Sequence, residues 1–305
     1  MLDDLLKPQR KTQMLNNIAR SILPSSVKDV LQVYKPLHLG PQIKNLEIIE
    51  AGIGAEGLPF LKLSTGKIFY GVEPTSLEKF IYKLIPRDAK NNLPEYAFRI
   101  ALDIIFRYRG RESSDIASGK YYGFELGDTI VECGAYLGYF SLRASEMVGE
   151  TGKVIAIEPI EENLKIFREN VRVNSIKNIT IIPKGIWNMP RQMSIFREKR
   201  QRASLIKNVV GGKKQYTIDC DSIDNILHEF NLDSIGFVRI QVNGAELEAL
   251  EGMQHTLPKT KRILISALYK RNGKYAYKTV DEILKKKGFK TTIANGNVLG
   301  LSGKS

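Results

Sequence analysis

Two acidic residues and two glycines lie at spacings that could hold a small charged ligand. Glu132, Gly134 and Gly138 form a Glu-x-Gly-x-x-x-Gly pattern, and Glu158 follows 24 residues after Gly134. Glycines in a tight turn let the backbone come close to a ligand because they carry no Cβ atom. The first acid would repel a pyrophosphate but could hold an ammonium group, and the second suits the two hydroxyls of a ribose. An amino acid at one end and a ribose at the other describe S-adenosylmethionine (SAM) better than NAD.

These residues fall where two strands and a helix are expected to meet. Residues 129–133 form a short run with β-branched side chains, residues 139–148 suit a helix, and residues 154–157 form a second apolar strand. The helix is expected to begin at the glycine turn. Strand, turn, helix and strand together predict the front half of a nucleotide-binding α/β unit.

Further apolar runs extend this unit into a larger sheet. Strands are expected at residues 179–182, 193–196, 216–220, 237–242 and 262–267, with helices between several of them. Two more strands, at residues 289–294 and 298–301, flank Asn295-Gly296, and Asn-Gly is the strongest signal for a two-residue hairpin. The sequence therefore predicts an α/β fold with a doubly wound, mostly parallel seven-stranded sheet that ends in an antiparallel hairpin.

The first part of the chain has a different character. Residues 1–35 suit one or two amphipathic helices, residues 46–72 have strand character, and residues 77–84 and 94–108 suit helices. A polar, loop-like stretch follows at residues 110–120. We therefore expect an N-terminal α+β extension over residues 1–120 and a ligand-binding domain over residues 121–305.

Composition narrows the class of protein. The 305 residues are 43% hydrophobic and 26% charged, which is ordinary for a globular protein, and no apolar run approaches the roughly 18 residues of a membrane helix. The first residues do not fit a secretory signal, so we expect a cytoplasmic protein. Cys133 and Cys220 fall in expected strands and are interpreted as reduced core thiols. Two cysteines and three histidines offer too few ligands for a metal site, so no metal is expected.

The formal net charge of +13 comes from two segments. Residues 191–214 carry eight basic residues and one acidic residue, and residues 259–290 carry eleven basic and two acidic residues. Such segments could attract a polyanion or a phosphorylated substrate, or could be solvated surface. Three arginines of the first segment are candidate substrate-binding residues: Arg197, Arg200 and Arg202.

Five segments in register resemble the FkbM family of SAM-dependent methyltransferases. They read GDTIVECGAYLGYFSL, GKVIAIEPIEENLKIFRENVRVN, KGIWN, TIDCDSID and VRIQVNGAELEALEGM, and they cover most of residues 121–257. The resemblance implies a Rossmann-like fold, SAM as the cofactor and an O-methylated small molecule or glycan as the product.

The resemblance also implies a set of cofactor-binding residues. Glu132 takes the place of the usual aspartate at the end of the first strand, and Glu158 would bind the ribose hydroxyls. The last two residues of the set would flank the adenine. The set comprises Glu132, Gly134, Ala135, Tyr136, Gly138, Glu158, Pro159, Ile160, Gly185 and Ile186.

One strand departs from the family. Where the family typically reads Lys-x-Asp-x-Glu-Gly-x-Glu, this chain has Arg239, Gln241 and Asn243 in place of the lysine and the first two acids. Gln and Asn keep much of the shape and hydrogen bonding of the acids, but they cannot take up a proton at neutral pH. Glu246 keeps the last acid of the pattern. The candidate catalytic residues are therefore Gln241, Asn243 and Glu246.

Three functions remain open. The first is SAM-dependent O-methylation of a small molecule or glycan, for which a strong base is dispensable when the acceptor is already nucleophilic or loses its proton late. The second is methylation of RNA with the basic segment at residues 191–214, since binding through phosphates needs such charge. The third is a catalytically silent SAM-binding or scaffold protein, suggested by the replaced acids. The sequence does not define the oligomeric state.

Overall fold

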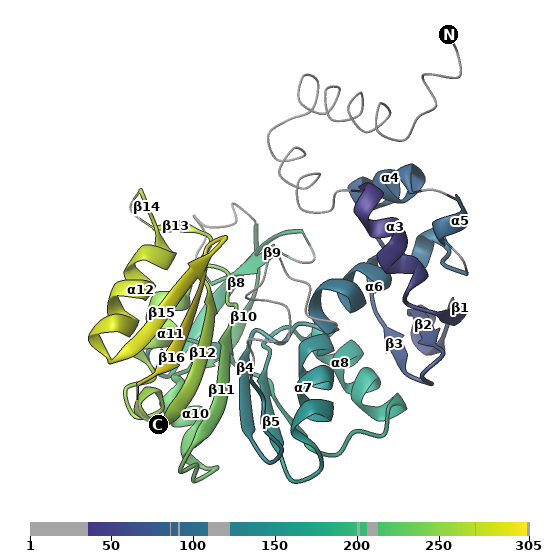
Figure 1. Ribbon diagram of the computed structural model, residues 1–305. Coiled ribbons are helices and arrows are strands. Elements are labelled where there is room, and N and C mark those ends of the chain that lie inside the picture. The colour runs from purple at the N-terminus through teal and green to yellow at the C-terminus, as the bar shows by residue number, and fades with distance from the viewer. Residues whose placement is uncertain are drawn as a thin grey trace. The chain divides into compact units, whose positions relative to one another are not determined.

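The computed structural model describes residues 36–85, 87–90, 92–108, 123–199, 202–205, 213–271 and 273–303. The chain divides into two compact units, residues 1–105 and residues 106–305 (Figure 1). The boundary that the sequence predicted, at residues 120 and 121, lies among the residues outside this description and stays a prediction. No helix among the described residues is long and apolar enough to cross a membrane.

The N-terminal unit has the α+β composition that the sequence predicted. Strands β1 (Ile48–Ile53), β2 (Pro59–Leu63) and β3 (Ile68–Tyr70) form an antiparallel sheet in chain order. The turn between β2 and β3 includes Gly66, at a φ of 84°. Helices accompany this sheet: α3 (Pro36–Lys44), α4 (Ser76–Leu84), α5 (Arg87–Lys90) and α6 (Phe98–Asp103).

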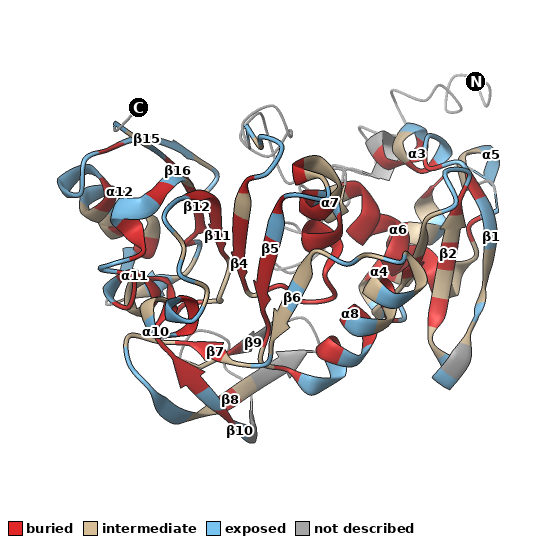
Figure 2. Ribbon diagram, turned by 90° about the horizontal axis from the view of Figure 1, so that it is seen from below, coloured by how far each residue is buried: buried red, intermediate tan, exposed pale blue. Residues whose placement is uncertain are grey.

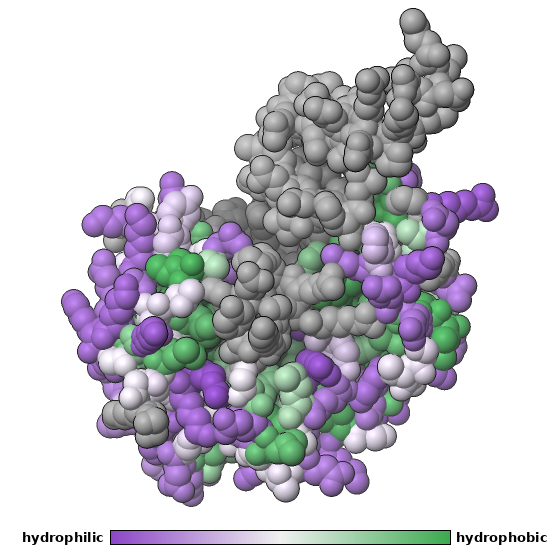
Figure 3. Space-filling model, viewed as in Figure 1, coloured by the Kyte–Doolittle hydropathy of each residue, from purple (hydrophilic) through white to green (hydrophobic). Residues whose placement is uncertain are grey.

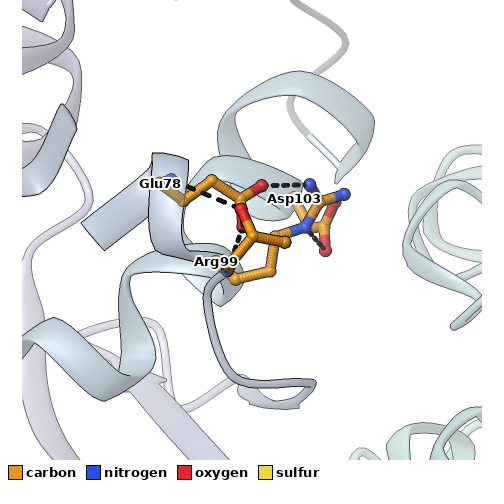
Figure 4. Close-up of polar contacts among 4 residues, drawn as sticks. Glu78, Arg99 and Asp103 are labelled. Atoms are coloured by element: carbon orange, nitrogen blue, oxygen red, sulfur yellow. Dashed lines mark hydrogen bonds and ion pairs between the residues drawn. The ribbon is translucent and has the colours of Figure 1, made fainter. Parts of the chain in front are cut away.

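A buried cluster of charges joins α4 to α6 (Figure 4). Arg99 donates from Nη1 to Oε1 of Glu78 at 2.7 Å, and from Nε and Nη2 to the two carboxylate oxygens of Asp103 at 2.9 and 2.7 Å. Glu78 also caps α4, since it accepts from the backbone nitrogen of Thr75 at 2.8 Å. Two carboxylates around one guanidinium use its planar fork of donors, which holds the two helices in one relative position.

Helix α6 does not end in an ordinary α-turn. It continues as a π-helical turn, Ile104–Tyr108, which enters the C-terminal unit. There the hydroxyl of Tyr108 donates to Oε2 of Glu146 at 2.6 Å. Short π-turns inside α-helices are frequent at functional sites.

The C-terminal unit contains the predicted seven-stranded sheet, in the order β15-β16-β12-β11-β4-β5-β6. The five strands from β12 to β6 are parallel, and β15 and β16 form the antiparallel hairpin at one edge. This confirms the fold class expected from the sequence. The strands are β4 (Thr129–Cys133), β5 (Lys153–Ile157), β6 (Ile179–Ile182), β11 (Ile235–Ile240), β12 (Thr260–Ser266), β15 (Phe289–Ala294) and β16 (Asn297–Ser302).

Helices pack on both faces of this sheet because the central strands are apolar on both faces. In β4, Ile130 faces a cluster that includes Phe140 of α7 (Tyr139–Val148), whereas the next residue, Val131, faces a cluster with residues of α10, α11 and α12. The buried centre of the sheet is visible in Figure 2. The remaining helices are α8 (Glu161–Val173), α10 (Ile223–His228), α11 (Glu246–Glu251) and α12 (Ala276–Lys286).

A second, smaller sheet was not predicted. Its strands are β7 (Gly185–Ile186), β8 (Arg191–Lys199), β9 (Arg202–Ser204) and β10 (Lys213–Asp221), in the order β7-β10-β8-β9. The sequence predicted shorter strands, at residues 193–196 and 216–220. In the structure both strands extend further, into charged residues that the apolar pattern does not mark. On the face shown in Figure 3, apolar side chains lie in small groups among hydrophilic ones, as is usual for a globular protein.

Candidate active site

A pocket lies at the carboxyl ends of β4, β5 and β11 in the C-terminal unit. In open α/β sheets, ligands bind in the crevice outside these strand ends. Loops after the three strands, the π-turn and the small sheet all contribute to its wall. The lining residues are Arg107, Gly134, Tyr136, Ile157, Glu158, Pro159, Ile160, Asn163, Lys184, Gly185, Ile186, Ile195, Ser204, Leu205, Gln241, Val242 and Asn243.

The glycines after β4 allow close packing of the backbone. Gly134 has a φ of 85°, and a Cβ atom at this position would overlap the carbonyl oxygen of Gln241. Gly138 has a φ of 81°, and its Cβ atom would overlap the ring of Phe167 on α8. Gly134 therefore keeps the ends of β4 and β11 together beside the pocket, whereas Gly138 seats α7 against α8.

The turn between the two glycines is held by the acid at the end of β5. Tyr136 adopts a left-handed φ of 56°, and its backbone nitrogen donates to Oε2 of Glu158 at 2.8 Å. Oε1 of Glu158 accepts from the backbone nitrogen of Ile160 at 3.1 Å and from Nδ2 of Asn163 at 3.0 Å. Glu158 is only 4% exposed, and this burial raises its pKa to about 7, although the three donors oppose the rise. Oε2 keeps a lone pair for a further donor, because it accepts only one of these three bonds.

Beyond Glu158 the wall is apolar and closely packed. Ile160 and Ile186 are 5% and 3% exposed. Gly185 lets β7 lie against β10, since a Cβ atom there would approach Sγ of Cys220 to 2.6 Å. At the edge of this wall, Nζ of Lys184 pairs with Oδ2 of Asp221 at 2.9 Å. A flat, apolar heterocycle would match this part of the pocket.

Glu132 is engaged by protein donors rather than open to the pocket. Its Oε1 accepts from Nη1 of Arg239 at 2.8 Å, and its Oε2 accepts from Oγ of Ser141 at 2.5 Å. Glu132 and Arg239 are neighbours in register on β4 and β11, and they are 1% and 2% exposed. Burial raises the pKa of Glu132 to about 6 against the opposing effect of Arg239. Glu132 is not among the described residues that line the pocket, so in this structure it forms a buried ion pair.

The same arginine orients the amide that replaces the family's first acid. Nη2 of Arg239 donates to Oε1 of Gln241 at 2.6 Å. A guanidinium has no acceptor, so the oxygen of Gln241 must face it and the amide NH₂ group is left for other partners. Gln241 lines the pocket, and it offers a hydrogen-bond donor there instead of a base.

The loop after β11 contacts the small sheet. Asn243 has a left-handed φ of 52°, and its carbonyl oxygen accepts from Oγ of Ser204 at 2.7 Å. Glu246 is fully buried, and its Oε1 accepts from the backbone nitrogen of Gly244 at 2.9 Å. Burial raises the pKa of Glu246 to about 7. Among the described residues, Asn243 lines the pocket and Glu246 does not; Glu246 instead holds the backbone at Gly244, just before α11.

The C-terminal unit matches the model of the methyltransferase FkbM domain over residues 132–291, just over half of the chain. The chain belongs to the FkbM methyltransferase family. Residues 132–291 therefore form a methyltransferase domain, as the sequence predicted. The order of its main sheet agrees with this assignment.

Individual relatives of this FkbM methyltransferase cover smaller parts of it. It is 34% identical over 136 residues to the tRNA (adenine(57)-N(1)/adenine(58)-N(1))-methyltransferase of Methanocaldococcus jannaschii, a match that spans 44% of this chain and 39% of the relative. Among solved structures it is similar to methyltransferase FkbM from Methylobacillus flagellatus, with 18% identity, a TM-score of 0.45, and coverage of 68% of this chain and 54% of that one. A SAM-dependent methyltransferase from Aquifex aeolicus is also 18% identical, with a TM-score of 0.36 and coverage of 65% and 92%. Overall similarity at these scores adds nothing to the family assignment.

Most of the expected site residues come together at one pocket. Those that line it are Gly134, Tyr136, Glu158, Pro159, Ile160, Gly185, Ile186, Gln241 and Asn243. Ala135 is buried in the turn beneath it. Arg197 and Arg202 lie on β8 and β9, but their side chains, and all of Arg200, are outside the described residues. Their role as substrate-binding residues stays a prediction.

Several lining residues were not anticipated from the sequence. Asn163 could have been suspected, since it lies on the first turn of the helix that follows Glu158. Ser204 and Leu205 belong to no sequence motif. They line the pocket because the small sheet places the end of β9 there. Arg107 lies 25 residues before Glu132, so no local pattern connects it to the site.

Proposed function

We propose that the pocket holds SAM with its ribose at Glu158 and its adenine between Pro159, Ile160 and Ile186. The residues fit this group. Glu158 lines the pocket with acceptor capacity left on Oε2, and apolar side chains continue the wall beyond it. The left-handed backbone at Gly134 and Tyr136 brings the turn close enough to support the methionine half.

In this placement the residues that follow β11, Gln241 and Asn243, would be on the acceptor side of the pocket. Bound SAM supplies a methyl group on a positively charged sulfur. The chain would position an acceptor in line with that bond, which is the main requirement of such a transfer. Gln241 and Asn243 would hold the acceptor by hydrogen bonds, and neither can remove its proton.

The proposed acceptor is an oxygen of a small molecule or glycan, either already deprotonated or losing its proton late in the transfer. Such a transfer would break the carbon–sulfur bond of SAM as the carbon–oxygen bond forms, giving S-adenosylhomocysteine and the methylated oxygen, with any proton passing to solvent. The hydrogen bond from Ser204 to the carbonyl of Asn243 is the observation that carries this choice. It holds Ser204 of β9 beside Asn243, and both residues line the pocket with Leu205, which favours a small acceptor.

RNA is the second candidate. The relative from Methanocaldococcus jannaschii is named as a tRNA adenine-N1 methyltransferase. A ring nitrogen of that type carries a lone pair without a proton, so it suits a site that offers the Gln241 amide and no base. The basic character of residues 191–214 agrees with a polyanionic acceptor.

Transfer from methyl-labelled SAM distinguishes the candidates. Purified protein is incubated with the small-molecule, glycan and RNA fractions of a cell extract, and the Glu158→Ala variant is the matched control. We expect label in small-molecule or glycan material, and its absence with the variant. Label that is released by ribonuclease would refute the proposed acceptor in favour of RNA. Saturable SAM binding without transfer to any fraction would indicate the catalytically silent alternative.

A further inference from the structure

Arg107 is a cation in the pocket that neither the sequence motifs nor the family match explains. It belongs to the π-turn Ile104–Tyr108 and lines the pocket. The matched family segment begins at residue 132, so Arg107 lies outside it. The preceding segment therefore adds a charged group to a pocket whose other lining residues all belong to the matched family segment.

The contacts of Arg107 place it at the β4 end of the pocket. Its guanidinium carbon lies 5.0 Å from the centre of the Tyr136 ring, over the turn between Gly134 and Gly138. Stacking on an aromatic ring fixes the plane of a guanidinium, in which its N–H donors lie. Arg107 is also close enough to Glu132 for its charge to lower the pKa of that carboxyl. Both neighbours belong to β4 or its turn, on the opposite side of Glu158 from the apolar wall.

The charges at this end favour an anionic group. Glu132 could have attracted the ammonium group of an amino acid, but Arg239 and Ser141 already occupy both its oxygens. With the ribose at Glu158 and the adenine against Ile160 and Ile186, the part of SAM left for the β4 end is its amino-acid half, whose carboxylate is its only anionic group.

We propose that Arg107 binds the α-carboxylate of the methionine half of SAM. The assignment rests on the proposed placement of the cofactor. Arginine is suited to this role because its planar fork matches the two oxygens of a carboxylate. The contact would select cofactors that carry the complete amino acid, and it would make the π-turn part of the cofactor site.

A ligand-truncation cycle tests this assignment without knowledge of the acceptor. Binding of S-adenosylhomocysteine is compared by calorimetry with binding of 5′-methylthioadenosine, which keeps the adenosine and the sulfur but lacks the amino acid. Arg107→Ala should weaken S-adenosylhomocysteine binding about 10- to 100-fold, the usual effect of losing a hydrogen bond to a charged group. It should change binding of 5′-methylthioadenosine by about twofold or less, and Arg107→Lys should recover part of the loss because it keeps the charge.

Two controls separate this effect from damage to the fold. Arg143→Ala removes an arginine that stacks on Tyr108 at 5.9 Å and pairs with Glu146 at 3.4 Å, outside the residues that line the pocket. It should leave both affinities unchanged. Glu158→Ala should weaken both ligands, because both carry the ribose. Melting temperatures without ligand report folding of every variant, and Arg107→Gln replaces Arg107→Ala if the alanine variant is unstable.

The outcomes also separate this proposal from the cofactor placement. Equal weakening of the two ligands by Arg107→Ala, or unchanged binding of S-adenosylhomocysteine, would overturn the role of Arg107. Failure of Glu158→Ala to weaken either ligand would instead overturn the placement of the ribose on which that role depends.

Discussion

Replacing Arg239 by methionine should destabilise the C-terminal unit strongly. The ion pair between Arg239 and Glu132 spans 2.8 Å, and the two side chains are 2% and 1% exposed. Methionine keeps much of the apolar volume but leaves the carboxylate of Glu132 buried without its cation. Removing one partner of a buried pair typically costs about 3–5 kcal/mol, and we expect a loss in this range. The Arg239→Met/Glu132→Gln double variant should recover most of it, because no uncompensated charge remains.

The loss should depend on pH in a defined direction. In the intact protein burial holds the pKa of Glu132 at about 6 in the folded state, above its ordinary 4.5, while Arg239 opposes the rise. Without Arg239 the folded-state pKa moves further up. A raised carboxyl pKa means that stability is fully present below about pH 4.5 and is lost as the pH rises through the folded-state value. The destabilisation by Arg239→Met should therefore be smaller at pH 5 than at pH 8.

Urea unfolding followed by tryptophan fluorescence measures these differences for the relevant unit. Trp187 is the single tryptophan of the chain and lies in the C-terminal unit, so its signal reports that unit. A loss below about 1 kcal/mol for Arg239→Met, or a double variant no more stable than the single one, would refute the idea that this buried pair depends on mutual neutralisation.

Two further predictions concern the pocket. Ribose hydroxyls should bind the ionised form of Glu158, whose pKa is about 7. The affinity for S-adenosylhomocysteine, measured by calorimetry, should therefore fall about tenfold for each pH unit below 7. An affinity that does not change between pH 5.5 and 7 would contradict this. Gly134→Ala should lower the free energy of unfolding by more than Gly127→Ala. Both positions have a φ of 85°, which costs about 1–3 kcal/mol, but only at Gly134 would the Cβ atom overlap a backbone oxygen, that of Gln241. Equal losses in urea unfolding would show that the overlap relaxes.

The elements of the main sheet were predictable because each is marked locally. The run at residues 129–133 is apolar without helical period, Asn295-Gly296 marks the hairpin, and the acid after β5 stands at a spacing set by one helix and one loop. Such features depend on neighbours within a few residues, and the sequence contains them in full. The pocket-facing position of Glu158 followed from the same local order.

The burial of Glu132 in an ion pair was not predictable from such local features. Its partner, Arg239, is 107 residues away and meets it only because β4 and β11 are adjacent and in that register. The same arginine also orients the amide of Gln241. Arg107 is a similar case, since a helical turn far from the motif brings it to the pocket. Residues that meet through sheet order and register leave no mark in the local pattern.

A change of length in the π-turn at residues 104–108 would change which side chain lines the pocket. A π-turn holds one residue more than the α-turn it replaces, so a single-residue deletion there would restore a regular helix. The side chains that follow would then rotate by about 100° around the helix axis, and another residue would take the position of Arg107. The loss of one codon would thus exchange the cation at this end of the pocket while every strand of the sheet keeps its sequence.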